Sequence, residues 1–366
     1  MTKNQVSLRV AGNEYHGWLS VSVVIALQML ARSFTLSLTT QSSLDPKKQF
    51  KVAPGDSVEL LIGEDLVVTG FVTKVSESYS GLSRQLTVEG KSKTVDLVDC
   101  CIPDGATYSY KKQKPISILT SVASHYKIKV VEEVKKEDLV DITFPPEGKI
   151  GESFITLLKK VNLLLTDNAN GDLVLVSPGS SKRCSTDLKL GSNILTGSRT
   201  IDQGKLFQRY VLLGQGANPL SERASKDSKL KAVAEDSKVR YRVNTMTQTG
   251  NAIEAQLQAR IGLIRDVSKA NAETLSYTVQ GWRQGDGKLW SVNSFVRVAD
   301  SNFGIDKEYL IESVEFSKSS LGMTTKLGLT SPNAFVNTEA ESAEKAIKNS
   351  LLESIKPVEK AEWTGK

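Results

Sequence analysis

The sequence contains very little of the side-chain chemistry that enzymes use. Its 366 residues include only two histidines, His16 and His125, which lie far apart in the chain. Histidine is the usual general base and the commonest metal ligand, so this scarcity argues against most hydrolytic and metal sites. Glycine-rich phosphate-binding motifs and a nucleophile elbow are also absent. We therefore predict a protein that is not an enzyme, with no catalytic, cofactor-binding or metal-binding residues and no cofactor.

Cysteine is equally scarce. Cys100, Cys101 and Cys184 make an odd count with two adjacent members, which is a poor disulfide framework, and no CxxC pair points to zinc. The first fifteen residues have no apolar signal-peptide core. The most apolar window, Trp18 to Leu30, is too short to span a bilayer and is interrupted by polar residues, so it predicts a buried strand or helix turn. We expect folding in a cytoplasm, without membrane insertion.

Charge of one sign does not dominate. The 47 basic and 41 acidic residues leave a net charge of +6, and runs such as Lys111-Lys112 are only pairs, which argues against a dedicated nucleic-acid binder. The densest acidic cluster, from Glu132 to Asp141, also contains Lys135-Lys136, so we interpret it as a solvated surface. A carboxylate pair brought together by the fold stays open, because sequence spacing cannot show it.

The first quarter of the chain alternates apolar and polar residues. This period of two predicts short strands separated by turns, and such strands are typical of a small β-barrel or sandwich. We assign residues 1–95 to a first β-barrel domain. The predicted strands are Val6–Val10, Phe34–Leu38, Val58–Ile62, Val67–Val75 and Arg84–Val88.

The pattern changes in residues 96–176, which we assign to an α+β module. Helical spacing begins at Pro115 and again at Gly151, and residues 127–131 alternate as a strand. Asn168-Ala169-Asn170-Gly171-Asp172 predicts a tight turn between two apolar strands.

Residues 177–336 form a second β-rich region, which we predict to be a second barrel with an inserted loop and helix. The loop is the polar segment Ser221 to Lys238. The helix begins near Asn251, which with Glu254 resembles a capping box. Its apolar stripe consists of Ile253, Leu257, Ile261 and Ile264. Residues 337–366 are expected to be a polar C-terminal helix and tail.

The two β-rich regions end in similar hairpins. Placing Gly81 on Gly322 puts Leu86 on Leu327 and Val88 on Leu329, with a looser register upstream that requires a bulge. This repeat predicts a duplicated barrel. Three chains with two similar barrels each would present six barrels in a ring, which would mate a three-fold object to a six-fold one.

Three segments together carry a family resemblance over about residues 1 to 336. They are GDSVELLIGEDLVVTGFV, GESFITLLKKVNLLLTDNANGDLVLV, and GKLWSVNSFVRVADSNFGIDKEYLIESVEFSKSSLGMTTKLGLTSPNAF. Their order and spacing resemble the baseplate hub proteins of contractile-tailed phages, above all the Mu-type tail protein and its prophage versions. The large hub protein of T-even phages and the hub part of type VI secretion spikes are related to these.

The resemblance implies a mainly β fold with two tube-like barrels and intervening α/β modules per chain. It also implies a homotrimeric ring with pseudo-six-fold symmetry at the tip of the tail tube, through which DNA passes in transit. The implied partners are the tail tube, other baseplate proteins and a spike on a separate chain. The implied place is the virion tail baseplate, after folding and assembly in the bacterial host cytoplasm. The trimer-interface residues stay unknown at this stage.

Two other functions stay open beside the structural hub. The first is a carbohydrate- or receptor-binding tail protein, which should expose clustered aromatic residues. Trp18, Trp282, Trp290 and Trp363 are mostly scattered instead, and we interpret the first three as core or interface anchors. The second is a peptidoglycan-degrading tail enzyme with a hidden carboxylate pair.

Overall fold

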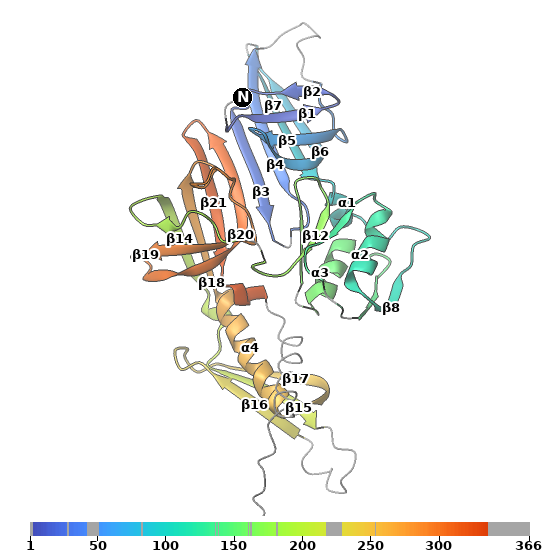
Figure 1. Ribbon diagram of the computed structural model, residues 1–366, viewed down its shortest axis with the longest axis vertical. Coiled ribbons are helices and arrows are strands. Elements are labelled where there is room, and N and C mark those ends of the chain that lie inside the picture. The colour runs from blue at the N-terminus through green and yellow to red at the C-terminus, as the bar shows by residue number, and fades with distance from the viewer. Residues whose placement is uncertain are drawn as a thin grey trace, which may run out of the picture. The chain divides into compact units, whose positions relative to one another are not determined.

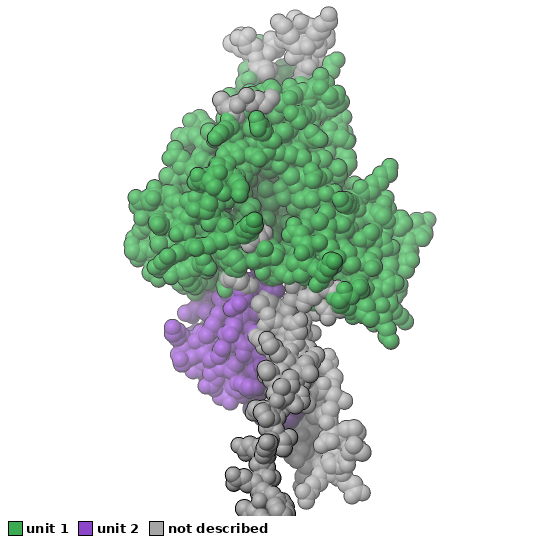
Figure 2. Space-filling model, viewed as in Figure 1, with its two compact units in different colours: residues 1–201, 273–332 green, residues 202–272, 333–366 purple. Residues whose placement is uncertain are grey.

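The structure is a computed structural model whose chain folds as two compact units. Unit 1 comprises residues 1–201 and 273–332, and unit 2 comprises residues 202–272 and 333–366 (Figure 2). The residues that the structure describes are 3–27, 29–41, 51–81, 83–135, 137, 139–159, 161, 163–180, 182–216, 229–252 and 254–335. The described chain is mainly β, as the sequence predicts.

Unit 1 is built on one large sheet (Figure 1). Its thirteen strands are β1 (Val6–Val10), β2 (Asn13–Tyr15), β3 (Ser20–Ala26), β4 (Ser33–Gln41), β5 (Ser57–Ile62), β6 (Asp65–Tyr79), β7 (Ser83–Ser92), β13 (Leu188–Lys189), β14 (Ile194–Ile201), β18 (Glu273–Gln280), β19 (Phe295–Asp300), β20 (Ile305–Ser319) and β21 (Gly322–Thr330). Eleven follow the order β14-β18-β21-β20-β3-β4-β7-β6-β5-β1-β2. Strand β19 pairs with β20, and β13 pairs with β19.

The expectation of two separate closed barrels in one chain is wrong in one respect. The described strands close no barrel, because β3 and β20 join the two halves into a continuous sheet. Their antiparallel pairing runs from Ser313 opposite Ala26 to Lys318 opposite Val21. The C-terminal half of β20 therefore hydrogen-bonds to the other half of the sheet instead of closing its own.

A single hydrophobic cluster spans both halves of this sheet. The apolar window at Trp18 contains β3, in which Val21, Val23 and Ile25 are buried and alternate with more exposed neighbours. They belong to the same cluster as Leu36 and Phe316, from the first and second halves respectively. The prediction of a buried strand is confirmed, and so are the five other strands predicted in the first quarter of the chain.

The middle of unit 1 is an α+β module with its own core. Its elements are α1 (Val95–Asp99), β8 (Ser109–Gln113), α2 (Pro115–Ser124), β9 (Val130–Glu132), β10 (Val140–Thr143), α3 (Ile150–Lys159), β11 (Leu164–Asp167) and β12 (Leu173–Val176). Leu119 of α2 and Phe154 of α3 are fully buried in that core. The helices predicted at Pro115 and Gly151 are confirmed.

Unit 2 is a three-stranded sheet with one helix packed on it. Its elements are η2 (Gln203–Lys205), β15 (Arg209–Gly216), β16 (Lys229–Glu235), β17 (Val243–Ala252) and α4 (Glu254–Ala272). Leu257 and Ile261 of α4 are buried against Tyr210 and Leu212 of β15. The predicted helix is confirmed, with Ile264 partly buried beside it and Ile253 outside the described residues. It begins at Glu254, and Asn251 of the predicted capping box lies in β17 instead.

One sequence prediction in unit 2 is partly wrong. The segment Ser221–Lys238 was expected to be a polar loop, but residues 229–235 form β16. The small apolar residues Ala232 and Ala234 lie between Lys231 and Glu235, on either side of Val233, and they are buried in the cluster that α4 covers. Residues 217–228, and the predicted tail 337–366, lie outside the described residues.

The chain ends, as far as it is described, in η3 (Pro332–Phe335). A membrane-crossing helix would need a long apolar run, and none of the helices in the described ranges is long and apolar enough for that.

Gly70 is a point where two strands of the large sheet approach very closely. A Cβ atom at this position would collide with the carbonyl oxygen of Lys91 in β7, which is backbone and cannot move aside. We expect Gly70→Ala to destabilise unit 1 by about 2 kcal/mol, because overpacking of this kind costs roughly 1–3 kcal/mol. Urea unfolding followed by tryptophan fluorescence measures it.

Gly81→Ala is the matched control for this change. It lies in the turn after β6, and no heavy atom lies within 4 Å of its added Cβ. An equal loss of stability in both variants would contradict the packing explanation.

Candidate functional site

Among the described residues, no group of three or more His, Cys, Asp or Glu side chains is placed to hold a metal ion. The three cysteines are free thiols. Burial raises the pKa of Cys184 to about 12, so this thiol stays protonated and is a poor nucleophile.

The acidic cluster of the α+β module has basic partners. Glu137 lies 2.5 Å from Lys114 Nζ, and Asp141 accepts a hydrogen bond of 2.6 Å from the backbone nitrogen of Lys112. These contacts agree with the interpretation of a mixed-charge surface.

Three of the four tryptophans are core residues, as predicted. Trp18, Trp282 and Trp290 are at most 3% exposed. The Trp282 indole nitrogen donates to the carbonyl oxygens of Ser317 and Thr324, at 3.0 and 3.1 Å, and so braces the hairpin of β20 and β21. These three rings form no exposed platform for a sugar, while Trp363 lies outside the described residues.

The motif around Trp290 and Asn293 has a structural explanation. Asn293 adopts a left-handed backbone conformation with φ of 61°. Its side chain donates to the Ser177 carbonyl at 2.9 Å and to Ser180 Oγ at 3.0 Å, and it accepts from the Gly179 nitrogen at 2.7 Å. Asn293 therefore fixes the chain that enters the second half of the sheet.

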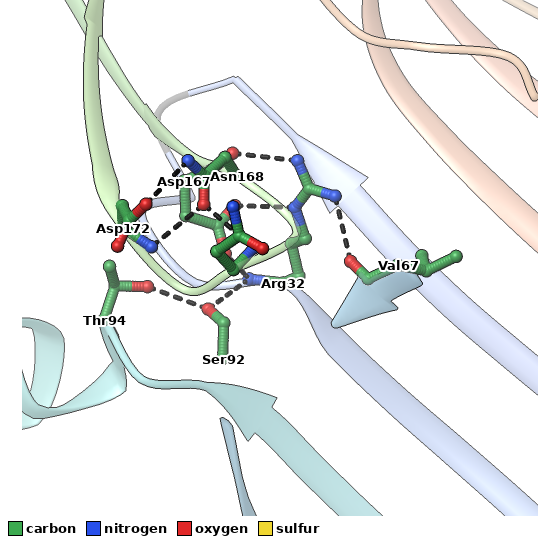
Figure 3. A network of polar contacts seen from close by, with 8 residues as sticks. Arg32, Val67, Ser92, Thr94, Asp167, Asn168 and Asp172 are labelled. Atoms are coloured by element: carbon green, nitrogen blue, oxygen red, sulfur yellow. Dashed lines mark hydrogen bonds and ion pairs between the residues drawn. The ribbon is translucent and has the colours of Figure 1, made fainter. Parts of the chain in front are cut away.

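A buried ion pair connects the α+β module to the large sheet. Arg32, just before β4, places Nε 3.1 Å from Oδ1 of Asp167 at the end of β11 (Figure 3). The backbone nitrogen of Arg32 donates to Asp167 Oδ2 at 3.0 Å. The two Nη atoms donate to the carbonyl oxygens of Asp167 and Val67, at 2.9 and 3.0 Å. We call Arg32, Asp167 and Ser92 the polar joint.

The polar joint lies almost entirely out of water. The side chains of Asp167 and Arg32 are 3% and 15% exposed. Burial raises the pKa of the Asp167 carboxyl, and the Arg32 guanidinium opposes that rise. Ser92 Oγ accepts from the Arg32 nitrogen at 3.1 Å and lies 2.8 Å from Thr94 Oγ1. Charges in such a place are tolerated only when they are paired and hydrogen-bonded, as here.

The turn after β11 is shaped to fit against the sheet. Asn168 Oδ1 accepts from the backbone nitrogens of Asn170 and Asp172, at 2.9 and 3.0 Å. Gly171 has φ of 75°, and a Cβ there would lie 2.7 Å from the Thr69 carbonyl oxygen of β6. The predicted turn is confirmed. Its docking on β6 was missed, because sequence pattern alone does not reveal such a tertiary contact.

The large sheet has several strand edges, and we call two of them, on β14 and on the C-terminal part of β6, the free edges. Strand β14 begins the strand order and, among the described strands, pairs only with β18; its Leu195 and Ile201 are each 53% exposed. Strand β6 pairs with β5 only up to Phe71. From Thr73 to Tyr79 no other described strand pairs with the side of β6 that faces away from β7, and Tyr79 is 87% exposed.

The free edges are therefore the candidate site for assembly. Exposed edges present unpaired backbone groups and are templates for pairing with another chain. No sequence pattern indicated these edges, because edge position depends on long-range strand order.

These edges define the chain as a protein with surfaces suited to assembly with other chains. Family models match both halves of the sheet. Residues 5–92 match the N-terminal domain of the Mu phage baseplate assembly protein GpP-like family, and residues 253–338 match the fourth domain of the Mu phage baseplate assembly protein GpP.

The similar proteins lie in the same group. The baseplate hub protein gp44 of Escherichia phage Mu is 28% identical over 324 residues, which cover 85% of this chain and 83% of that protein. The crystal structure of the 43 kDa tail protein of prophage MuSo2 from Shewanella oneidensis matches with a TM-score of 0.79 and 26% identity, over 90% of this chain and 99% of the other. The predicted resemblance to Mu-type baseplate hub proteins is confirmed.

The fold extends to more distant proteins. An E. coli component of the type VI secretion system, described as structurally similar to the T4 bacteriophage tail proteins gp27 and gp5, matches with a TM-score of 0.52. It is 11% identical, and the match covers 88% of this chain and 76% of that one. At this identity the likeness concerns the fold.

The polar joint gives a prediction about stability. Asp167→Asn leaves the buried Arg32 cation without its counter-charge, so we expect a loss on the order of 3 kcal/mol, the lower end of the range for breaking a buried pair. Urea unfolding of the full-length protein measures this.

The double variant Arg32→Met with Asp167→Asn is the matched control. It removes the cation as well, and it should recover part of the lost stability. The explanation is wrong if the double variant is less stable than Asp167→Asn alone.

Proposed function

We propose that this chain is a structural hub of a contractile-tail baseplate. The observation that carries the proposal is a repeated strand order within a chain homologous to the Mu hub protein. In the first half the order is β4-β7-β6-β5, and in the second half it is β18-β21-β20-β19, with the last three strands of each set consecutive in sequence.

The two hairpins repeat in detail. Strands β6 and β20 are both fifteen residues long, and each contains one bulge in its pairing with the next strand, at Thr73 and at Glu312. The bulge lies at the same distance from the turn in both hairpins. Thr73 lies seven residues before Ser80, whose nitrogen donates to the Ser83 carbonyl. Glu312 lies seven residues before Ser319, which pairs with Gly322.

This pairing register corrects the alignment made from sequence by two residues. The shared bulges place Val75 on Val314 and Val88 on Leu327, so Gly81 aligns with Ser320 and not with Gly322. A shift of two keeps every side chain on the same face of its strand, which is why the apolar pattern matched in either register.

We propose further that three chains form a ring of six such halves. Residues 1–95 and 177–336 would supply the tube-like parts, residues 96–176 the intervening module, and residues 337–366 the C-terminal tail. The ring would adapt the six-fold tail tube to a three-fold spike carried on a separate chain, and DNA would pass through it during ejection. A duplicated unit in a trimer is the simplest way to meet both symmetries.

The same proposal gives the protein a place and a mode of action. The hub would belong to the virion tail, after assembly in the host cytoplasm. The relatives named above are structural tail and baseplate proteins, which supports a geometric role instead of an enzymatic one.

Light scattering of the purified protein tests the proposed ring. One chain is 39.9 kDa, so three chains should weigh about 120 kDa. A particle of two or four chains would contradict the three-fold hub. A zymogram that shows cleavage of peptidoglycan would contradict a purely structural role.

A further inference from the structure

Four adjacent strands in each half of the sheet correspond to each other in the repeat. The first half runs β3-β4-β7-β6, and the second half runs β14-β18-β21-β20. Strand β3 pairs with β4, which pairs with β7, and β14 pairs with β18, which pairs with β21. Because β7 corresponds to β21 in the repeat, β14 corresponds to β3. Each half therefore has one outer strand at its beginning and one at its end.

Inside the chain, the first strand of one half already pairs with the last strand of the other. This is the antiparallel contact of β3 with the C-terminal half of β20. The corresponding strands that are left over are β14 and the C-terminal half of β6. They are the two free edges, and Figure 1 shows them on opposite sides of the sheet.

We propose that β14 of one copy pairs antiparallel with residues 74–79 of β6 in a second copy of this chain. This contact between two copies would correspond to the antiparallel pairing of β3 with β20 within one copy. Addition of a strand to an exposed edge supplies main-chain hydrogen bonds to groups that otherwise face water. A free edge on each half of the repeat allows the contact to propagate from copy to copy in one direction.

The internal contact also fixes the register of the proposed one. Val21 of β3 lies opposite Leu36, which lies opposite Val88 on the next strand. In the same way, Gly197 of β14 lies opposite Tyr277, which lies opposite Leu327. Since Val88 corresponds to Leu327, Val21 corresponds to Gly197.

Each observed pair of β20 with β3 predicts one pair of β6 with β14 between copies. The pair of Val314 with Ile25 predicts Val75 opposite Ile201, and the pair of Phe316 with Val23 predicts Glu77 opposite Arg199. Lys318 opposite Val21 becomes Tyr79 opposite Gly197, and the alternate positions give Ser76 opposite Thr200 and Ser78 opposite Ser198.

The side chains that this register brings together are complementary. The carboxylate of Glu77, which pairs with Arg84 within the chain, would face the guanidinium of Arg199, which pairs with Glu273, and opposite charges directly across two strands are favourable. Ile201 is half exposed in the single chain and would gain Val75 as an apolar neighbour. The exposed ring of Tyr79 would lie beside Gly197, next to the rings of Tyr277 and Phe303 that cover this glycine within the chain.

The number of copies rests on the proposed function, whereas the pairing itself does not. Two halves per chain give six halves when three chains close, and the strand contact would then continue around the ring. A pairwise experiment and a ring experiment therefore separate the two proposals.

Cysteine cross-linking between two different chains tests the pairing. One full-length chain carries Ser76→Cys and the other Thr200→Cys, both with Cys100 and Cys101 replaced by Ser. Directly opposed residues lie about 4.5–5.5 Å apart between Cα atoms, within the range that a disulfide spans. Mild oxidation of the mixture should give a covalent dimer on a non-reducing gel.

Ser76→Cys mixed with Ser198→Cys is the matched control, shifted by two residues along β14. Diagonal neighbours lie roughly 7–8 Å apart, beyond that range, so we expect about tenfold less dimer. Equal yields from the two mixtures, or no dimer from either, would overturn the pairing.

A chain that carries both Ser76→Cys and Thr200→Cys tests the ring. Three linked chains as the largest covalent species would support pairing and three-fold closure together. Four linked chains would keep the pairing and overturn the three-fold hub. A particle of three chains by light scattering without cross-links would keep the hub and overturn the pairing.

Discussion

The pairing of β3 with β20 is the contact on which the rest of unit 1 depends. It joins segments near the two ends of the chain, since Ala26 lies opposite Ser313. Strand β3 of the first half pairs with β20 of the second half, and one hydrophobic cluster contains residues of both halves. Contacts of such large sequence separation form slowly, because the loop must be closed before the contact stabilises it. The two halves are therefore expected to fold as one cooperative unit.

The polar joint is the second constraint, and it connects the α+β module to the large sheet. The α+β module has a core of its own, so apolar packing alone does not determine how it meets the sheet. Arg32 solves this by donating to Asp167 from its side chain and its backbone while also bonding to Val67 in the sheet. The directional bonds give the orientation, and the adjacent turn at Gly171 gives the close fit.

Local patterns predicted local structure well. The alternation in residues 34–38 and the apolar stripe of Leu257 and Ile261 depend on neighbours in sequence, and both led to the right element. The strand β16 was missed because its buried residues are mainly alanines, which carry little apolar signal beside lysine. Strand order was beyond sequence reasoning. It decides that β14 and β6 are edges, and the alternation of a strand is the same at an edge as in the middle of a sheet. The two-residue error in the repeat has the same origin, since only the bulges at Thr73 and Glu312 mark the true register.

The position of unit 2 in the repeat has a consequence for how such hubs diversify. Unit 2 leaves the sheet after Ile201 and returns at Glu273, two residues that pair with each other across β14 and β18. Its own ends also meet, with the Asp202 nitrogen 2.8 Å from the Ala272 carbonyl oxygen. In the first half the same connection is the short link from β3 to β4. Segments whose ends lie together can be inserted without disturbing their host. Recombination among related phages could therefore exchange, shorten or remove this piece while leaving the register of every strand around it unchanged.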